Sequence, residues 1–220
     1  MDFLPPLVIY VIGAGPGDPS MISLKALEIL KKCPLVMGWR NVVDKLREYI
    51  KGEVVYLTYT NQEEILQKYL KTEGDVCIIT HGDPCVSDWE FLERIKAFKA
   101  DVVVINGVSS LNVALARLGL DMAHIVFATL HARSPQDLRP LVAILHHRVL
   151  IAFPYPTADG PQRLARELIA LGATGCKATV LENLTLKDER IWQGGLEELS
   201  RETRHFSDLS VVAVDCRGSS

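Results

Sequence analysis

Short apolar runs alternate with longer amphipathic segments along this chain. An apolar run of a few residues between turn residues is typical of a buried strand, whereas apolar residues three and four apart are typical of a helix. In the first half the pattern predicts strands at residues 7–12, 34–37, 54–57, 76–80 and 102–105. The helices predicted around them span residues 20–32, 42–50, 61–69, 89–98 and 111–118. This alternation indicates a largely parallel sheet with helices on both faces.

The second half repeats the alternation less regularly. Its predicted strands are residues 125–128, 149–153, 178–181 and 209–214, with a short further strand at 189–192. Predicted helices at 136–145 and 161–171 lie between them. The segment Leu118-Gly119-Leu120-Asp121 is typical of a helix end, and we expect the domain junction there. The chain is therefore predicted to be a two-domain α/β protein with domains at 1–119 and 120–217 and a tail at 218–220.

Composition narrows the class of protein. The 220 residues carry 24 Lys and Arg against 27 Asp and Glu, a formal net charge of -3. Proteins that bind nucleic acid usually show a strongly basic face, and no apolar run here approaches the ~20 residues of a membrane span. We expect no nucleic-acid partner and no membrane segment. Residues 1–6 contain an acidic residue and no basic one, unlike a secretory signal peptide.

The cysteines and histidines give no sign of a metal site. The six histidines form no H-x-x-x-H pattern and the five cysteines no C-x-x-C pair. We interpret the cysteines as reduced thiols of a cytoplasmic protein and expect neither a disulfide nor a bound metal. They are Cys33, Cys77, Cys85, Cys176 and Cys216.

A glycine-rich loop, Gly13-Ala14-Gly15-Pro16-Gly17-Asp18, follows the first predicted strand. It is not a dinucleotide-binding fingerprint, because Asp18 stands where a third glycine would let helix and strand pack closely. Pro16 also lacks the backbone N–H that would face a pyrophosphate. Three glycines in five positions still indicate a tight turn whose backbone closely approaches something else. Two interpretations stay open: the loop binds a ligand, or it is only a strand-to-helix turn without one.

Two more loops of this kind follow other strands of the first half, at His81-Gly82-Asp83-Pro84 and at Asn106-Gly107-Val108-Ser109-Ser110. In an open parallel sheet, ligands bind outside the carboxyl ends of the strands. The three loops therefore predict one shared binding site. They contain no P-loop lysine and no G-x-S-x-G motif, so they do not indicate a nucleoside triphosphatase or a serine hydrolase.

These loops, together with Ser23-Leu24-Lys25-Ala26-Leu27, resemble the tetrapyrrole methylase superfamily, and the resemblance covers nearly the whole chain. It implies a two-domain α/β fold with a mostly parallel sheet in the first domain and a mixed sheet in the second. It also implies S-adenosylmethionine as the methyl donor, S-adenosylhomocysteine as its product, a cofactor site in the inter-domain cleft and a homodimer.

Four segments are similar to one branch of that superfamily, which methylates C5 of a precorrin or cobalt-precorrin in cobalamin (vitamin B12) biosynthesis. They are Leu130-His131-Ala132-Arg133, Leu181-Glu182-Asn183, Asp188-Glu189-Arg190-Ile191 and Phe206-Ser207-Asp208-Leu209. The resemblance implies that the decarboxylating C15-methyltransferase of that pathway is a separate protein. Two alternatives stay open. One is another superfamily member acting on a different corrin position, uroporphyrinogen, ribosomal RNA or a modified histidine; the other is a non-catalytic nucleotide-binding module.

The family pattern implies where the cofactor is bound. Asp83 suits a ribose hydroxyl or the amino group, or it only closes an Asp-Pro turn. Ser109 and Ser110 contact the ligand, cap the next helix, or do both. The full implied set is Pro16, Asp83, Val86, Ser109, Ser110, Phe153 and Leu181.

The implied substrate is a polycarboxylate, so basic residues are candidates for binding it. Arg133 comes first, because a guanidinium binds a carboxylate through a bidentate fork, and Arg40 is either a second clamp or a surface residue. His131 is a substrate contact, a proton acceptor or a structural histidine. Methyl transfer from a sulfonium to an electron-rich carbon needs positioning above all, so we assign no catalytic residue.

Overall fold

The structure is a computed structural model that describes residues 8–69, 74–98, 100–131 and 137–218. Its contacts divide the chain into two compact units, residues 1–109 and 110–220. The boundary between the units, at residues 109–110, lies one helix earlier in the sequence than the junction predicted at 119–120. That helix, α6 (Ser110–Leu118), packs against a strand of the second unit and donates from Arg117 to Glu189 of that unit at 2.7 Å.

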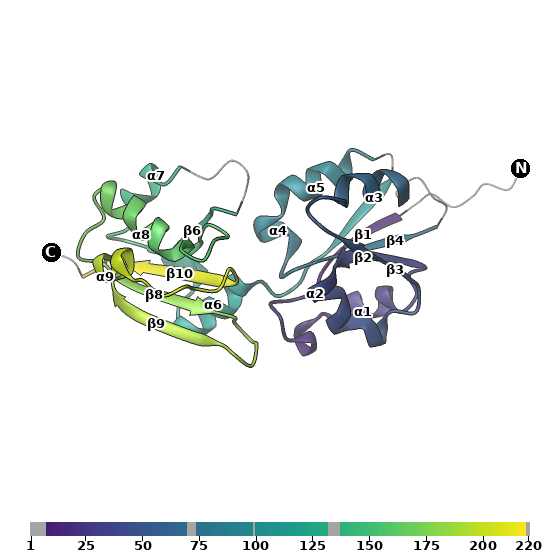
Figure 1. The fold of residues 1–220 in the computed structure, drawn as a ribbon, viewed down its shortest axis with the longest axis horizontal. Helices are drawn as coiled ribbons and strands as arrows, with labels where there is room; N and C mark the ends of the chain where they lie inside the picture. Colours follow the sequence, from purple (N-terminus) through teal and green to yellow (C-terminus); the bar gives the residue numbers. More distant parts are fainter. Residues whose placement is uncertain (1–7, 70–73, 99, 132–136, 219–220) are drawn as a thin grey trace, which may run out of the picture. The chain divides into compact units, whose positions relative to one another are not determined.

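The first unit contains one parallel five-stranded sheet in the order β3-β2-β4-β1-β5 (Figure 1). The strands are β1 (Val8–Gly13), β2 (Leu35–Trp39), β3 (Glu53–Leu57), β4 (Val76–Thr80) and β5 (Asp101–Ile105). The central strands are almost continuously apolar, as expected of a sheet covered on both faces. Because all five run the same way, their carboxyl ends lie along one edge.

Helices cover both faces of this sheet. One face carries α1 (Leu24–Leu30) and α2 (Arg40–Val43), and the opposite face carries α3 (Gln62–Tyr69) and α5 (Trp89–Lys96) (Figure 1). The side chain of Ser23 accepts a hydrogen bond from the Ala26 N–H and so caps α1. Alternate strand residues enter the two cores, so that Ile12 and Ile79 pack with α1 while Val11 and Ile78 pack with α5.

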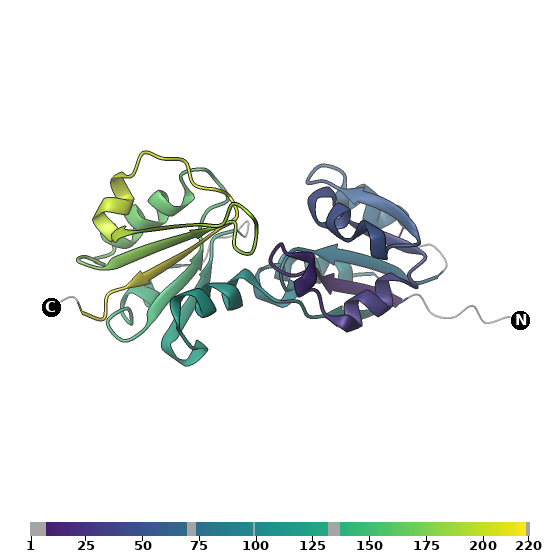
Figure 2. The same cartoon turned by 90° about the horizontal axis from the view of Figure 1, so that it is seen from below.

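The second unit contains a mixed sheet in the order β6-β7-β10-β8-β9. Its strands are β6 (Ile125–Thr129), β7 (Val149–Phe153), β8 (Lys177–Glu182), β9 (Arg190–Gly195) and β10 (Ser210–Asp215). β6 and β7 are parallel, whereas β10 is antiparallel to β7 and β8, and β9 to β8. The helices α8 (Gly160–Ala170) and α9 (Leu196–Arg201) pack on one face and α6 on the other (Figure 2). The predicted fold class, a parallel and a mixed sheet in two α/β domains, is confirmed.

Three predicted helices differ from the structure. The helix expected at 20–32 is a short 3₁₀ turn (Pro19–Met21), capped by Asp18, followed by α1. The helix expected at 42–50 is the single turn α2 followed by the 3₁₀ helix η2 (Asp44–Tyr49). Of the helix expected at 136–145, residue 136 lies outside the described residues, and the described α helix is α7 (Arg139–Val142), with turns after it.

The expectation of reduced cysteines is wrong for four of the five. Cys33 is disulfide-bonded to Cys77, and Cys176 to Cys216, each pair within one unit, while Cys85 is free and exposed. The partners are 44 and 40 residues apart in sequence, so their pairing depends on the fold and not on a local motif. Cysteine spacing therefore gives no support for a cytoplasmic location. Among the described residues, no helix combines the length and apolar character needed to cross a membrane.

Candidate functional site

The three glycine loops interlock at the carboxyl edge of the first sheet. The N–H of Gly15 donates to the carbonyl of Gly82 at 3.2 Å, and the N–H of Gly82 donates to the carbonyl of Gly15 at 2.8 Å. A Cβ on Gly13 would lie 2.5 Å from the Gly82 carbonyl oxygen and 2.7 Å from the Gly107 nitrogen. Gly15 and Gly82 have φ of 89° and 55°, which glycine adopts without strain. The loops therefore form one close-packed backbone surface, as their positions after parallel strands predicted.

Asp83 ties two of these loops together. One of its carboxylate oxygens accepts from the Cys85 N–H at 2.7 Å, which caps the short helix α4 (Pro84–Ser87). The carboxylate also accepts from the Asn106 side-chain amide at 3.1 and 3.3 Å. A carboxylate has about four acceptor positions, so these bonds leave capacity for a ligand donor. The turn interpretation of Asp83 is thus realised, and a role in ligand binding stays a prediction.

Three further implied cofactor residues of the first unit, Pro16, Val86 and Ser109, lie in segments that follow strands at the same edge. Pro16 is in the Gly13 loop, Val86 is in α4, and both are half-buried. Ser109 is buried, with 2% of its surface exposed, and Ser110 begins α6 in the second unit. The structure adds Thr80, at the end of β4 opposite Gly13. Its hydroxyl is buried and has no hydrogen-bond partner in the part of the chain that the structure describes.

Asp88 is an unusual acidic residue in the segment after Asp83, at the start of α5. Burial and the nearby negative charge of Asp83 raise the pKa of Asp88 to about 6. Asp18 shows the opposite effect. Its hydrogen bonds with Ser20, which include acceptance from the backbone N–H at 2.8 Å, lower the pKa of its carboxyl. The Asp18 carboxylate therefore caps the 3₁₀ turn that follows it.

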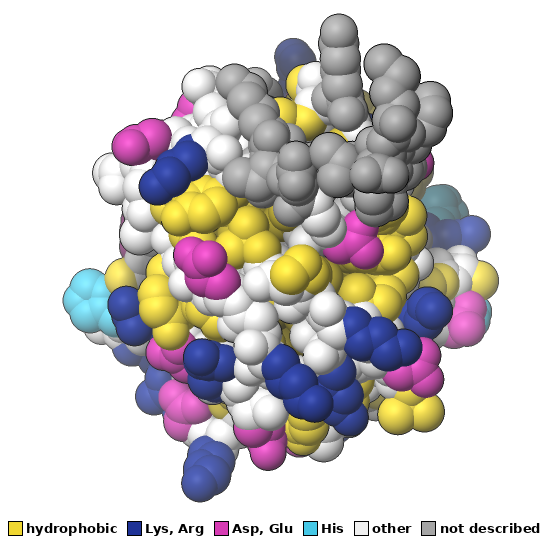
Figure 3. All heavy atoms as spheres, turned by 90° about the vertical axis from the view of Figure 1, so that its right-hand side faces the viewer, with side chains coloured by type: hydrophobic (Ala, Val, Ile, Leu, Met, Phe, Trp, Pro, Cys, Tyr) yellow, Lys and Arg dark blue, Asp and Glu magenta, His cyan; other side chains and the backbone are white. Residues whose placement is uncertain are grey.

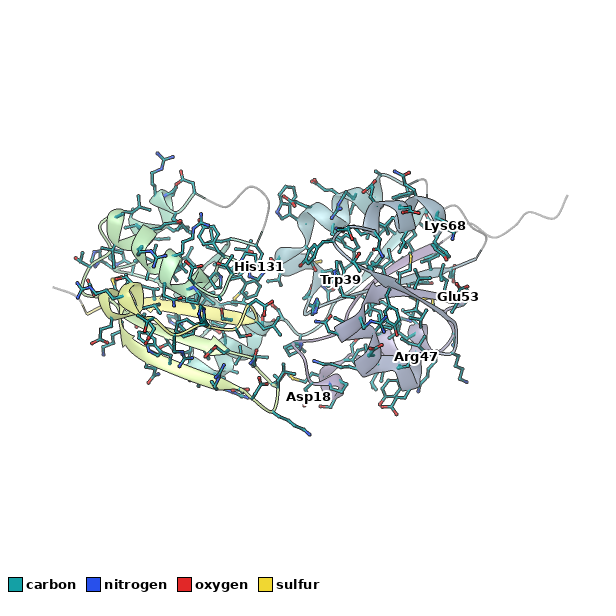
Figure 4. The ribbon with its side chains drawn as sticks, in the orientation of Figure 1. Asp18, Trp39, Arg47, Glu53, Lys68 and His131 are labelled. Carbon is teal, nitrogen blue, oxygen red and sulfur yellow. A yellow bond between two sulfur atoms is a disulfide. The ribbon has the colours of Figure 1, made fainter. Side chains whose placement is uncertain are left out.

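Arg40 lies just beyond the end of β2, at the same edge of the first sheet. Its guanidinium stacks on the ring of Tyr56 at 3.9 Å from the ring centroid, and Tyr56 donates to Asp44 at 2.7 Å. That hydrogen bond raises the pKa of Tyr56. Trp39, labelled in Figure 4, has a buried indole N–H without a hydrogen-bond partner among the described residues. Arg40 is thus held flat by an aromatic ring while it stays exposed.

A second candidate edge lies in the second unit. The carboxyl ends of β6, β7 and β8 and the start of β10 lie at one edge, because Thr129 pairs with Phe153 and Glu182 pairs with Ser210. His131 follows β6 at this edge (Figure 4). The implied cofactor residues Phe153 and Leu181 are buried at the ends of β7 and β8, on strands that flank β10.

The surroundings of His131 change the pKa of its ring. Its ring centroid lies 5.7 Å from that of Phe153. Desolvation by the surrounding protein lowers the pKa of His131, although part of the residue stays exposed. The negative charge of Asp208 and a hydrogen bond with the backbone of Pro154 act in the opposite direction. Burial is the largest of these effects, so the pKa of His131 is lowered overall.

Glu182 is a fully buried carboxylate that organises the loops at this edge. It forms ion pairs with Arg190 at 3.3 Å and with Arg204, and it accepts from the Ser207 N–H at 2.9 Å. Asn183, at φ 52°, accepts from the Ser207 hydroxyl at 2.7 Å, and its N–H donates to the Leu209 carbonyl at 2.9 Å. The segment before β10 is therefore fixed to the end of β8.

Most of these residues lie in segments that the sequence pattern singles out, but the pattern does not predict the hydrogen bonds and ion pairs between them. Asn106 and Glu182 both lie in such segments. Nothing in the sequence shows that Asn106 donates to Asp83 or that Glu182 pairs with two arginines. Thr80 gave no signal, because a threonine at a strand end is ordinary. Arg133 lies outside the described residues. Among the residues that are described, no three of His, Cys, Asp and Glu are grouped so as to hold a metal ion.

Residues 8–200 match a family model described as Tetrapyrrole (Corrin/Porphyrin) Methylases. The probable cobalt-precorrin-7 C(5)-methyltransferase of Methanocaldococcus jannaschii is 31% identical over 94% of this chain and 98% of that protein. The cobalt-precorrin-4 C(11)-methyltransferase of the same organism is 25% identical over 89% and 82%.

Two solved structures share the fold. Uroporphyrin-III C-methyl transferase from Thermus thermophilus, complexed with S-adenosylhomocysteine, has a TM-score of 0.77 and 25% identity, covering 96% of this chain and 93% of that one. Precorrin-6Y methylase from Archaeoglobus fulgidus has a TM-score of 0.73 and 22% identity, covering 94% and 97%. At that identity the second likeness shows the fold alone.

Proposed function

Because the chain belongs to the tetrapyrrole methylase family, whose members use S-adenosylmethionine, we propose that it methylates C5 of a precorrin or cobalt-precorrin in cobalamin biosynthesis. The observation that carries the C5 assignment is the 31% identity to the M. jannaschii C(5)-methyltransferase over 94% of the chain. The structure adds support, because the described residues of the four segments that resemble this branch border one edge of the second sheet. They follow β6, end β8, begin β9 and precede β10.

The residues of the first unit fit a bound S-adenosylmethionine. The interlocked glycine loops present backbone without side chains, and Thr80 and Ser109 are buried hydroxyl residues at that edge. We infer that Pro16, Asp83, Val86 and Ser109 of the first unit hold the cofactor, with Ser110, Phe153 and Leu181 from the second unit. The cofactor supplies an electrophilic methyl group on a sulfonium. The protein positions the carbon nucleophile against it, which needs no covalent catalytic residue.

The other family activities remain the second candidate, since relatives that methylate C11, C20 or uroporphyrinogen-III also match. Ribosomal RNA is disfavoured by composition, because 27 acidic residues stand against 24 Lys and Arg, whereas proteins that bind nucleic acid usually carry a strongly basic face. On the one face drawn in Figure 3, acidic and basic side chains are interspersed. We also infer from the family resemblance that the protein is a homodimer.

The substrate is tested directly with labelled cofactor. Purified protein is incubated with ¹³C-methyl S-adenosylmethionine and separate precorrins, cobalt-precorrins and uroporphyrinogen III, and the products are analysed by mass spectrometry and carbon NMR. We expect one labelled methyl group on C5 of a corrin precursor. Label at another corrin position, or on uroporphyrinogen III alone, would contradict the proposal.

The role of Asp83 in cofactor binding can be separated from its role as a loop tie. We expect Asp83→Ala to weaken S-adenosylhomocysteine binding by about 1–3 kcal/mol, because a ligand donor loses a charged acceptor. Asn106→Ala removes the hydrogen bond between the loops and keeps the carboxylate, so we expect a smaller loss. Titration calorimetry on both variants measures the difference. Equal losses would show that Asp83 acts only through the loops.

Arg133 is proposed to bind a substrate carboxylate. We expect Arg133→Ala to lower turnover of the corrin precursor at least tenfold, about 1.4 kcal/mol of transition-state binding, with cofactor affinity unchanged. Arg133→Lys should recover only part of this, because an ammonium cannot form the bidentate fork. Arg139→Ala, which removes an exposed arginine paired with Asp137, is the matched control. Unchanged turnover in both Arg133 variants would make it a surface residue, and lost cofactor binding would place it in the cofactor site.

A further inference from the structure

We propose that the Thr80 hydroxyl and the Trp39 indole N–H bind S-adenosylmethionine, an inference that rests on the proposed function. Thr80 ends β4 and Trp39 ends β2, the strand beside it, so both residues lie at the edge where the glycine loops interlock. Neither residue belongs to the set that the family pattern implies. Each is singled out by a buried polar atom that the described residues leave without a hydrogen bond.

Buried polar atoms of this kind are rare in the protein. Among the described residues, the side chains that have one are Trp39, Thr80, Gln162 and Ser210. Gln162 and Ser210 lie in the second unit, whereas Trp39 and Thr80 end neighbouring strands of the first. Folded proteins satisfy nearly all buried polar groups, because an unpaired group has lost its hydration without compensation. Two such atoms on adjacent strands therefore indicate a partner from outside the chain.

The sheet places the two side chains next to each other. Met37 of β2 pairs with Ile78 of β4, and both pack in the core that also contains Phe91 of α5. Side chains alternate along a strand, so Trp39 and Thr80, each two residues further on, point to the same face. The Trp39 ring agrees with this, because its centroid lies 5.5 Å from that of Phe91.

Polar groups close to this pair are engaged elsewhere. The Thr80 carbonyl accepts from the Ala14 N–H at 2.9 Å, which joins β4 to the first glycine loop. The Asn41 side-chain amide and the His81 ring are hydrogen-bonded, with 3.1 Å between their nitrogen atoms. On its other side, Thr80 pairs with Gly13, which has no side chain that could reach the hydroxyl.

The two groups suit an acceptor atom of the cofactor. An indole N–H only donates, and a threonine hydroxyl donates or accepts. S-adenosylmethionine carries acceptors in its carboxylate, its ribose hydroxyls and its adenine ring. Asp83 at the same edge only accepts when ionised, so it complements the pair by taking a donor. Because Thr80 is 1% exposed, the ligand atom that it meets is enclosed and shielded from water.

An unpaired buried hydroxyl acts on stability and on binding with opposite signs. In the free protein it lowers stability, because it has lost hydration and gained no hydrogen bond. In the complex it gains the cofactor as its partner. A hydroxyl that is bonded within the chain would instead stabilise the free protein, and its loss would lower stability.

The first test compares Thr80→Val with Thr80→Ser. Valine keeps the shape without the hydroxyl, so we expect the free protein to melt no lower than the wild type and its S-adenosylhomocysteine affinity to fall at least about fivefold. Serine keeps the hydroxyl and loses a buried methyl group, so the melting temperature should fall while the affinity stays within about twofold. Calorimetry measures both quantities.

Thr179→Val is the matched control, because Thr179 is a half-buried threonine in β8 outside the proposed site. We expect it to leave the affinity unchanged. A Thr80→Val protein that melts below the wild type would show that the hydroxyl is bonded within the chain. One that keeps wild-type affinity would show that the hydroxyl does not bind the cofactor. Either result overturns the assignment of Thr80.

The second test observes the indole N–H directly by ¹H–¹⁵N NMR. The chain has three tryptophans, and the Trp39 signal is the one that Trp39→Phe removes. We expect it to move downfield when S-adenosylhomocysteine is added, because a new hydrogen bond deshields the proton. The Trp192 N–H is the internal control, since it already donates to Glu202 at 3.1 Å and should stay in place. A Trp39 signal that stays in place or moves upfield overturns its role.

The outcomes separate this inference from the proposed function. Both tests use cofactor binding, so their results do not depend on which position of which tetrapyrrole is methylated. If the wild type binds S-adenosylhomocysteine and Thr80→Val binds it equally well, the assignment of Thr80 is wrong and the methyltransferase stands. If the wild type binds none, the proposed cofactor site and this inference are both wrong.

Discussion

Gly107→Ala is expected to abolish S-adenosylhomocysteine binding and to lower the free energy of unfolding by about 3 kcal/mol or more. A Cβ at Gly107 would overlap the Gly82 carbonyl oxygen and lie 2.7 Å from the Gly13 carbonyl oxygen. Both neighbours are backbone atoms at the ends of strands, so neither can move by a rotamer change. The two loops must separate, and their separation breaks up the surface proposed to hold the cofactor.

Urea unfolding followed by circular dichroism measures the stability, and titration calorimetry measures the binding. Gly195→Ala is the matched control, because Gly195 has φ −76° and ψ 154° and the nearest atoms to its added Cβ lie at 3.8 Å. That control should stay within about 1 kcal/mol of the wild type. A Gly107→Ala protein that binds with wild-type affinity would show that the loops can yield and would argue against a close-packed cofactor surface.

Glu182→Gln is expected to destabilise the second unit by about 3 kcal/mol, below the upper range for a broken buried ion pair. The amide oxygen still accepts from the Ser207 N–H and from Arg190, which share one carboxylate oxygen in the wild type, but Arg204 then faces an NH₂ group and both arginines lose their counter-charge. The cost is moderated because the side chains of Arg190 and Arg204 are 59% and 36% exposed and remain partly hydrated. The same change should loosen the segment that carries Asp208.

Chemical denaturation monitored by tryptophan fluorescence measures this change. Asp137→Asn removes a carboxylate from an exposed ion pair with Arg139 and is expected to change stability little. Hydrogen exchange at Ser207 and Leu209 should increase in Glu182→Gln and not in the control. Unchanged stability together with unchanged exchange would mean that the buried carboxylate does not hold this edge.

Much of the fold follows from local pattern. The strands at β4 and β7 were predicted to the residue, because each is an apolar run ended by a polar or turn residue and buried on both faces. The meeting of the Gly13, Gly82 and Gly107 loops also followed, because parallel strands place their carboxyl ends together.

The remaining features depend on contacts between distant residues. The helix α9 was missed because its six residues follow a strand directly, and Glu198 stabilises its start by accepting from the Gly195 N–H at 2.9 Å. The disulfides were missed because their pairing requires the sheet register. The burial of Glu182 depends on Arg204, which is 22 residues away. The 11–18-residue windows in which local patterns are recognised contain only one member of such a pair.

The order of the strands has a consequence for how the chain folds during synthesis. β1 is made first but lies between β4 and β5, so it has no sheet neighbour until residues 76–80 have been made. In the second unit the central strand β10 is made last of the five. At about 5–20 residues per second, the apolar β1 stays unpaired for several seconds on the ribosome. We infer that neither sheet forms strand by strand along the chain, because each needs a central strand that is made after its neighbours. Until that strand pairs, the unpaired strands can aggregate.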